Sequence, residues 1–237
     1  MDAMREGSVN AMSDGAWPAG ESRAVAAWEI ASVVSSTLVA EWAVLATVGG
    51  ESAWLALPVA LAFALILYSH RARREGLREL GLRFDNFTRA LVLLAAPMLA
   101  GALLFALVGW IGYGRGVRVG GGRAGFGLLK MGVGGVAWGL LQQYVLQAFV
   151  NRRAQVLWGR GAASVLLTAS VFALLHLPNP GLTAATFLGG LVWAAVYQRA
   201  PNLFALALSH ALMTWVLVST VPPAALRGLR VGFKYFG

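Results

Sequence analysis

The chain of 237 residues is 58% hydrophobic and only 12% charged, whereas a soluble domain usually carries about a quarter charged residues. A chain of this composition cannot present a charged surface on all sides, so we expect an integral membrane protein that contacts lipids and does not bind nucleic acid. The absence of cysteine excludes disulfides, thiolate metal sites and cysteine nucleophiles, and the formal charge of +9 sits mainly in short connections between apolar runs.

Residues 1–26 mix charged and small residues and are predicted to form a disordered cytoplasmic tail. Residues 27–221 divide into apolar segments of roughly the length that crosses a bilayer, about 20 residues each. We therefore predict an all-α, polytopic transmembrane helical bundle with about seven spans, followed by a basic C-terminal tail over residues 222–237. The predicted spans cover residues 28–48, 53–68, 87–113, 128–150, 163–177, 182–197 and 203–221.

Basic residues mark several connections between the predicted spans. The connection at 70–83 carries five arginines with interspersed leucines, which predicts an amphipathic segment on the membrane surface. Residues 151–160 are predicted to form a second basic connection, and the PNPG sequence at 178–181 a break between helices. Placing the N-terminus in the cytoplasm leaves most lysines and arginines on the inner side of the cytoplasmic membrane, as the positive-inside rule expects.

Side-chain amides cluster in the fourth predicted span. It contains Gln142, Gln143 and Gln147, and the four-residue steps from Gln143 to Gln147 and Asn151 predict that these three share one helix face. A single glutamine in a span commonly bonds to a neighbouring helix. Three amides within one and a half turns favour the lining of a polar site.

Two of the three histidines are also placed at membrane depth. His176 lies near the end of the fifth span, and His210 lies in the seventh, one turn before Thr214. Ionisable residues inside a membrane are candidates for function because hydrocarbon penalises them. Glu41 and Glu29 in the first span are candidates for the same reason, with hydrogen bonding to a polar neighbour as the alternative for Glu41.

Three segments in this order resemble the CPBP family of intramembrane proteases, which includes the CAAX-prenyl endopeptidases. The family pattern is EExxxR, then FxxxH, then HxxxN or HxxxD. The corresponding segments here are QQYVLQ at 142–147, FALLH at 172–176 and HALMT at 210–214. The segment LRELGLR at 77–83 is also similar to the family's approach to its third helix, so that the resemblance covers residues 71–218.

The resemblance implies an intramembrane endopeptidase that cuts a membrane-anchored or prenylated peptide. Gln142 and Gln143 occupy the positions of the family's glutamates, Gln147 that of the arginine and Thr214 that of the asparagine, while His176 and His210 are retained. An amide cannot accept a proton at neutral pH as a carboxylate does. Because no Asp or Glu follows Asp85, the proton acceptor would be Glu41 or a neutral histidine.

The resemblance implies no cofactor, and two histidines are too few for a catalytic zinc site, which usually takes three protein ligands. Two other functions fit the same residues. The chain could be a catalytically inactive relative that binds lipidated or hydrophobic peptides in the same cavity. It could also be a small transporter that uses the polar residues as a pathway, although no inverted repeat is visible in the sequence.

Overall fold

The computed structural model describes residues 19–48, 54, 56–114 and 130–237, and these ranges contain helices and no strands. The α-helices are α2 (Ala19–Leu38), α3 (Leu45–Val48), α4 (Ala56–Ala72), α5 (Phe87–Tyr113), α6 (Val136–Gln143), α7 (Arg152–Trp158), α8 (Ala162–Leu174), α9 (Pro180–Arg199) and α10 (Leu203–Thr220). Three π-helical segments, η1 (Val39–Val44), η3 (Lys130–Gly135) and η4 (Tyr144–Asn151), continue directly into α-helices, and two 3₁₀ turns, η5 (Arg227–Leu229) and η6 (Gly232–Tyr235), follow α10. The predicted all-α class is confirmed.

Four helical stretches are long and apolar enough to cross a membrane, namely Ser22–Thr47, Phe87–Tyr113, Pro180–Arg199 and Leu203–Thr220. The predicted spans at 53–68 and 163–177 correspond to the shorter apolar helices Ala56–Ala72 and Ala162–Leu174. The predicted span at 128–150 corresponds to the run from η3 to α7. These apolar helices are those of an integral membrane protein.

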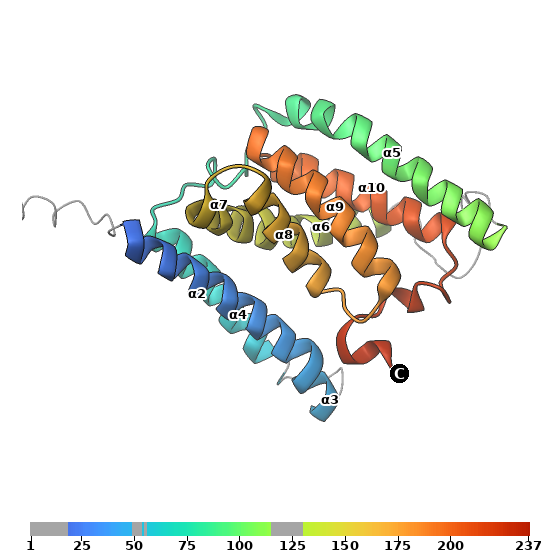
Figure 1. The fold of residues 1–237 in the computed structure, drawn as a ribbon, viewed down its shortest axis with the longest axis horizontal. Helices are drawn as coiled ribbons and strands as arrows, with labels where there is room; N and C mark the ends of the chain where they lie inside the picture. The colour runs from blue at the N-terminus through green and yellow to red at the C-terminus, as the bar shows by residue number, and fades with distance from the viewer. Residues whose placement is uncertain (1–18, 49–53, 55, 115–129) are drawn as a thin grey trace, which may run out of the picture.

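The helices form a bundle with α2 and α4 along one edge and α5 along the other (Figure 1). Between them, α8 packs on α9, and α10 packs on both α5 and α6. Close packing between α6 and α10 depends on Gly139, because a β-carbon there would lie 2.9 Å from the carbonyl oxygen of Ala207. The bundle therefore brings α6, α8 and α10, which carry the three motif segments, to its centre.

The ends of several elements differ from the sequence prediction. The first helix begins at Ala19, so residues 19–26 are helical, and the rest of the predicted tail lies outside the described residues. The prediction of a connection at 151–160 is wrong over most of its length, because α7 continues the helix to Trp158. Its arginines do not end the helix, since Arg153 is fully buried among acidic partners described below.

Asparagines begin the last two long helices. Asn179 accepts a hydrogen bond from the Leu182 amide at the start of α9, and Asn202 accepts one from the Ala205 amide at the start of α10. Each side-chain oxygen satisfies an amide that has no partner inside its helix. The predicted break at 178–181 is confirmed, and it turns the chain between α8 and α9.

Residues 222–237, predicted as a tail, pack back on the bundle. The Asn179 side chain donates to the carbonyl oxygens of Leu226 and Arg230, and the Gly232 amide donates to Leu177. Leu226 belongs to a buried cluster with residues of α9 and α10. This C-terminal segment therefore holds the turn that follows α8.

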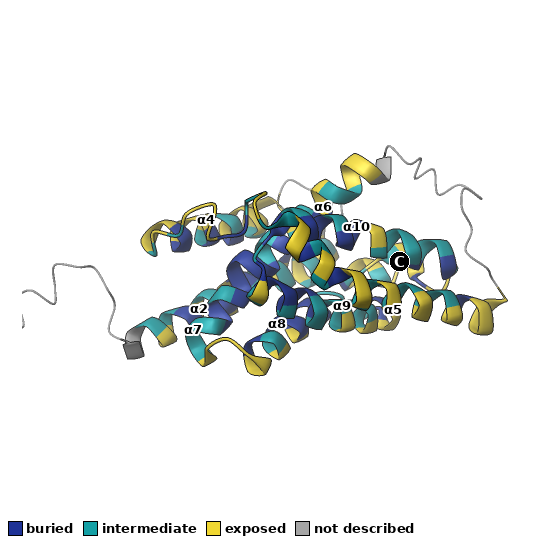
Figure 2. Ribbon diagram, turned by 90° about the horizontal axis from the view of Figure 1, so that it is seen from above, coloured by how far each residue is buried: buried dark blue, intermediate teal, exposed yellow. Residues whose placement is uncertain are grey.

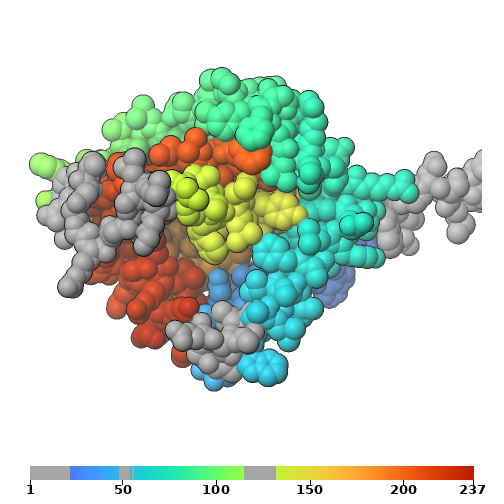
Figure 3. All heavy atoms as spheres, turned by 180° about the vertical axis from the view of Figure 1, so that it is seen from behind, coloured from blue at the N-terminus to red at the C-terminus, as the bar shows by residue number. Residues whose placement is uncertain are grey.

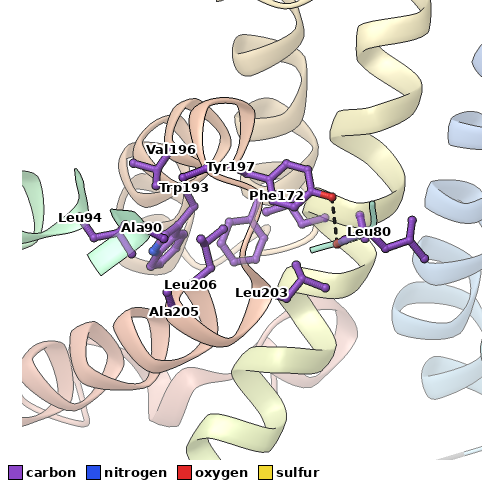
Figure 4. Close-up of a cluster of buried hydrophobic side chains, with 13 residues drawn as sticks. Leu80, Ala90, Leu94, Phe172, Trp193, Val196, Tyr197, Leu203, Ala205 and Leu206 are labelled. Carbon is purple, nitrogen blue, oxygen red and sulfur yellow. Dashed lines mark hydrogen bonds between the residues drawn. The ribbon is translucent and has the colours of Figure 1, made fainter. Parts of the chain in front are cut away.

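The largest buried apolar cluster lies where α5, α8, α9 and α10 meet (Figure 4). It includes the rings of Phe172, Trp193 and Tyr197, and the Tyr197 hydroxyl donates to the carbonyl of Leu80 at 3.0 Å. In contrast, α5 exposes large apolar side chains such as Val92 and Ile111 (Figure 2). Burial of apolar side chains at the centre, with apolar side chains also outside, is the pattern of a bundle that faces lipid.

Candidate functional site

His210 is held between an amide and an indole inside the bundle. The Gln143 side chain donates from Nε2 to His210 Nδ1 at 3.2 Å. The imidazole stacks on the ring of Trp193, with centroids 4.7 Å apart and an interplanar angle of 17°. Trp193 is itself fixed by donating from Nε1 to the Ser209 hydroxyl at 2.9 Å. The ring orientation of His210 is therefore set by α6 and α9 together.

His176 lies just beyond the last turn of α8, on the other side of Phe172. The Phe172 ring lies 4.8 Å from the His176 ring and 5.8 Å from the His210 ring, centroid to centroid. The four-residue spacing between Phe172 and His176 places the two rings in contact within one segment. Phe172 thus lies against both histidine rings, and Gln143 reaches His210 by its hydrogen bond, while the catalytic roles of these residues stay predictions.

The hydrogen bonds give the two imidazoles opposite polarity. His176 Nδ1 lies 2.8 Å from the Phe172 carbonyl oxygen, which can only accept, so Nδ1 of His176 carries its hydrogen. The amide nitrogen of Gln143 can only donate, so Nδ1 of His210 accepts. In the neutral state, His176 then presents an acceptor at Nε2 and His210 presents a donor. Neither Nε2 atom has a hydrogen-bond partner among the described residues.

The predicted row of amides is buried on one face of the helix. Gln143, Gln147 and Asn151 are all fully buried, and Asn151 donates to the Gln147 side-chain oxygen at 2.8 Å. Asn151 also accepts from Gln198, whose amide donates in turn to Ser164. Two atoms of the row, Gln143 Oε1 and Gln147 Nε2, are buried without a partner in the described protein. A free acceptor and a free donor one turn apart can bind a water or a peptide group.

Gln142 and Thr214 do not take part in these hydrogen bonds. Both are partly exposed, and neither forms a hydrogen bond with another described side chain or carbonyl. The structure brings neither into the contacts that join Gln143 and His210. Their assignment to the site, at the family's glutamate and asparagine positions, stays a prediction.

Glu41 lies on η1, outside these contacts, and its carboxylate atom Oε2 is buried without a partner in the described ranges.

A buried charge cluster, which the sequence did not predict, lies at the end of η4. Arg153 is fully buried and donates to Glu75 at 2.7 and 2.9 Å and to Ser69 at 2.8 and 3.1 Å. It also pairs with Glu29 of α2 at 3.0 Å. Arg73 pairs with the same Glu29 at 3.1 Å. We call these residues, with His70 and Arg152, the Arg153 cluster. It ties α2 and α4 to α7.

Glu75 stays ionised in this cluster. Burial of the carboxyl acts to raise its pKa, but hydrogen bonds with His70 and Arg153 and the charges of Arg153 and Arg152 outweigh burial and hold the pKa well below its ordinary value. Arg152 donates to Glu75 at 2.8 Å, and His70 Nδ1 lies 2.6 Å from it. Glu75 is therefore committed to the cluster. Glu29 was a candidate functional residue from the sequence, but the sequence did not predict its partners in the cluster.

One face of the molecule is hollowed between α4, α6 and the C-terminal segment, with the blue N-terminal helix visible at its floor (Figure 3). The helix α6, which carries Gln143, borders this hollow. In the described ranges, no three His, Asp or Glu side chains gather closely enough to hold a metal ion. The arrangement can orient a small polar group by hydrogen bonds from imidazoles and amides.

Residues 126–216 match the family model described as type II CAAX prenyl endopeptidase Rce1-like. The matched stretch contains the segments 142–147, 172–176 and 210–214 and the helices that position them. No curated protein and no solved structure matches the chain significantly. Across the helices that carry the candidate site, the chain is therefore similar to the CAAX protease family.

Proposed function

We propose that the chain is an intramembrane endopeptidase that hydrolyses a peptide bond beside the rings of His176 and His210. The observation that carries this proposal is the opposite polarity of the two imidazoles, which both contact Phe172. Hydrolysis needs a proton acceptor for the attacking water and a donor for the carbonyl oxygen. A pair of neutral histidines with these tautomers supplies both functions without a motif carboxylate.

In the proposed reaction, a water molecule gives a proton to His176 Nε2 while its oxygen adds to the carbonyl carbon of the substrate. The His210 Nε2–H donates to the oxyanion that forms, and Gln143 fixes the ring for this purpose. The protonated His176 then gives its proton to the leaving nitrogen, and the carbon–nitrogen bond breaks. Each histidine returns to its starting state.

We further propose that the substrate is a membrane-anchored or prenylated peptide. An apolar pocket of about 450 Å³ lies between η1 and the end of α8, next in sequence to His176. Its lining consists of Leu38, Val39, Trp42, Ala43, Leu174 and Leu177. A hydrocarbon chain in this pocket would leave the attached peptide near the histidines. The N-terminus would lie in the cytoplasm, and the protein in the cytoplasmic membrane.

The test is cleavage of prenylated and non-prenylated peptides by the purified protein in liposomes. We expect His176→Ala and His210→Ala each to reduce kcat by about a hundredfold or more. The matched control is His70→Asn, which alters the third histidine in the Arg153 cluster and should leave kcat within about threefold once folding is verified. Full activity of either alanine variant would contradict the proposal, as would the absence of cleavage by the wild type.

A second function is favoured by one specific observation, which is that no acid follows Asp85 in the chain. A relative without catalytic turnover would bind a lipidated or hydrophobic peptide in the same cavity. Saturable binding of a prenylated peptide without any product, together with activity created by Gln143→Glu, would favour this function over hydrolysis.

A further inference from the structure

The proposed reaction places a positive charge on His176 inside an apolar bundle. An unpaired buried cation is costly, and removal of one partner of a buried pair typically costs several kcal/mol for that reason. An anion near His176 would lower the cost of proton transfer. If the chain has the proposed function, a side chain near His176 is needed to supply that anion.

In the described ranges, most acidic side chains already have an ion-pair or hydrogen-bond partner. Glu29 and Glu75 belong to the Arg153 cluster, Asp85 pairs with Arg78 and Arg83, and Glu79 accepts from the Gly76 amide. Glu41 differs from these. Within the described ranges, its Oε2 is buried and has no hydrogen-bond partner. A polar atom in this condition inside a membrane helix is a candidate for function.

The C-terminal segment connects Glu41 to the turn that carries His176. A β-carbon added at Gly232 would lie 2.7 Å from the carbonyl oxygen of Glu41 and 2.8 Å from its β-carbon, so the two backbones are in contact. The Gly232 amide donates to the carbonyl oxygen of Leu177 at 2.8 Å. Leu177 directly follows His176. Gly232 therefore contacts both Glu41 and the residue that follows His176.

Other charged groups near Glu41 do not form ion pairs with it in the described residues. Arg230 and Lys234 flank Gly232 in the same segment, but both are exposed, and neither forms an ion pair with Glu41 in the described structure. The other elements in contact with η1 are α2, α3 and α4. Glu29 and the basic end of α4 are joined in the Arg153 cluster, at the other end of these helices.

We propose that Glu41 is a positioning residue whose carboxylate offsets the positive charge that forms on His176 during proton transfer. The first helix would thereby contribute the anion that the motif helix lacks. Gln143 and Gln142 could then remain amides, because the acidic charge would come from a different element. Glu41 takes no part in the proton transfer itself, in which the proton moves from water to His176 and then to the leaving nitrogen.

The test compares wild type, Glu41→Gln and Glu41→Asp in the liposome cleavage assay, with Glu79→Gln as the control at an exposed acid. We expect Glu41→Gln to lower kcat by about tenfold or more with KM within about twofold, since the anion acts on the protonated histidine only. Loss of the anion disfavours the protonated imidazole. The acid limb of the kcat–pH profile should therefore move to lower pH by about one unit.

An unchanged kcat and acid limb in Glu41→Gln would overturn the role of Glu41 while leaving the proposed proteolysis intact. Absence of cleavage by the wild type would instead overturn the proposed function. If Glu41→Gln does not fold, Glu41→Asp keeps the charge but withdraws it by one methylene. We then expect kcat to fall at least about twofold, and a wild-type kcat and profile would contradict the proposal.

Discussion

Removal of the Arg153 guanidinium should destabilise the protein by about 3 kcal/mol. Arg153→Leu keeps an aliphatic side chain but removes the donors that hold Glu75 at 2.7 and 2.9 Å and Glu29 at 3.0 Å. Breaking a buried pair in this way typically costs about 3–5 kcal/mol. We expect the lower end, because Glu75 keeps Arg152 and His70 and Glu29 keeps Arg73 and Ser69.

The same variant should change how stability depends on pH. The pKa of Glu75 is lowered in the folded protein, because its hydrogen bonds and the arginine charges outweigh burial. A carboxyl of this kind stabilises the fold above its unfolded pKa of about 4.3, and the stabilisation is lost as the pH falls further. In Arg153→Leu, part of this dependence should disappear. The free energy of unfolding should then fall less steeply between about pH 5 and acidic pH.

Reversible denaturant unfolding in mixed micelles, followed by tryptophan fluorescence at several pH values, measures both effects. The matched control is Arg78→Leu, because the Arg78 side chain is 72% exposed in its pair with Asp85. An exposed pair is worth about 1 kcal/mol at most. If Arg153→Leu loses no more stability than this control, the Arg153 cluster does not hold α2 and α4 to α7.

Two further predictions concern packing and helix capping. Gly139→Val should cost about 2 kcal/mol, because its side chain would collide with the Ala207 carbonyl oxygen, whereas Gly134→Val, with no atom within 4 Å of its β-carbon, should cost far less; equal unfolding midpoints would contradict close packing of α6 on α10. Asn202→Ala should lower the free energy of unfolding by at least about 1–2 kcal/mol, because the Ala205 amide loses its acceptor and the buried side chain no longer donates to Arg83 and Asn86. An unchanged unfolding midpoint would contradict this role.

The apolar segments of the sequence predicted most helices, since membrane spans are specified by local composition. The span predicted at 87–113 has the same ends as α5, because Gly114 adopts a left-handed conformation, with φ of 60°, that ends the helix. Helix ends were harder to predict where tertiary contacts decide them. The arginines at 152 and 153 resembled a surface connection, but burial of Arg153 keeps this stretch helical.

Spacing alone predicted the shared face of Gln143, Gln147 and Asn151, because four-residue steps fix side-chain direction along one helix. The contact between Gln143 and His210 depends on how α6 packs on α10, and the motif resemblance was needed to expect it. The Arg153 cluster could not be predicted in the same way. Its members come from four segments whose packing leaves no periodic signal in the sequence.

The π-helical winding of η4 sets the angle between two sites. A π-helical segment accommodates extra residues per turn, and an α-helix advances about 100° per residue. Deletion of one residue within 144–151 would favour α-helical winding, and the changed number of residues per turn would alter the direction of Gln143 relative to α7. Gln143 could then no longer face His210 while Arg153 faces Glu75. The number of residues in this wide turn is thus fixed by two unrelated sets of partners.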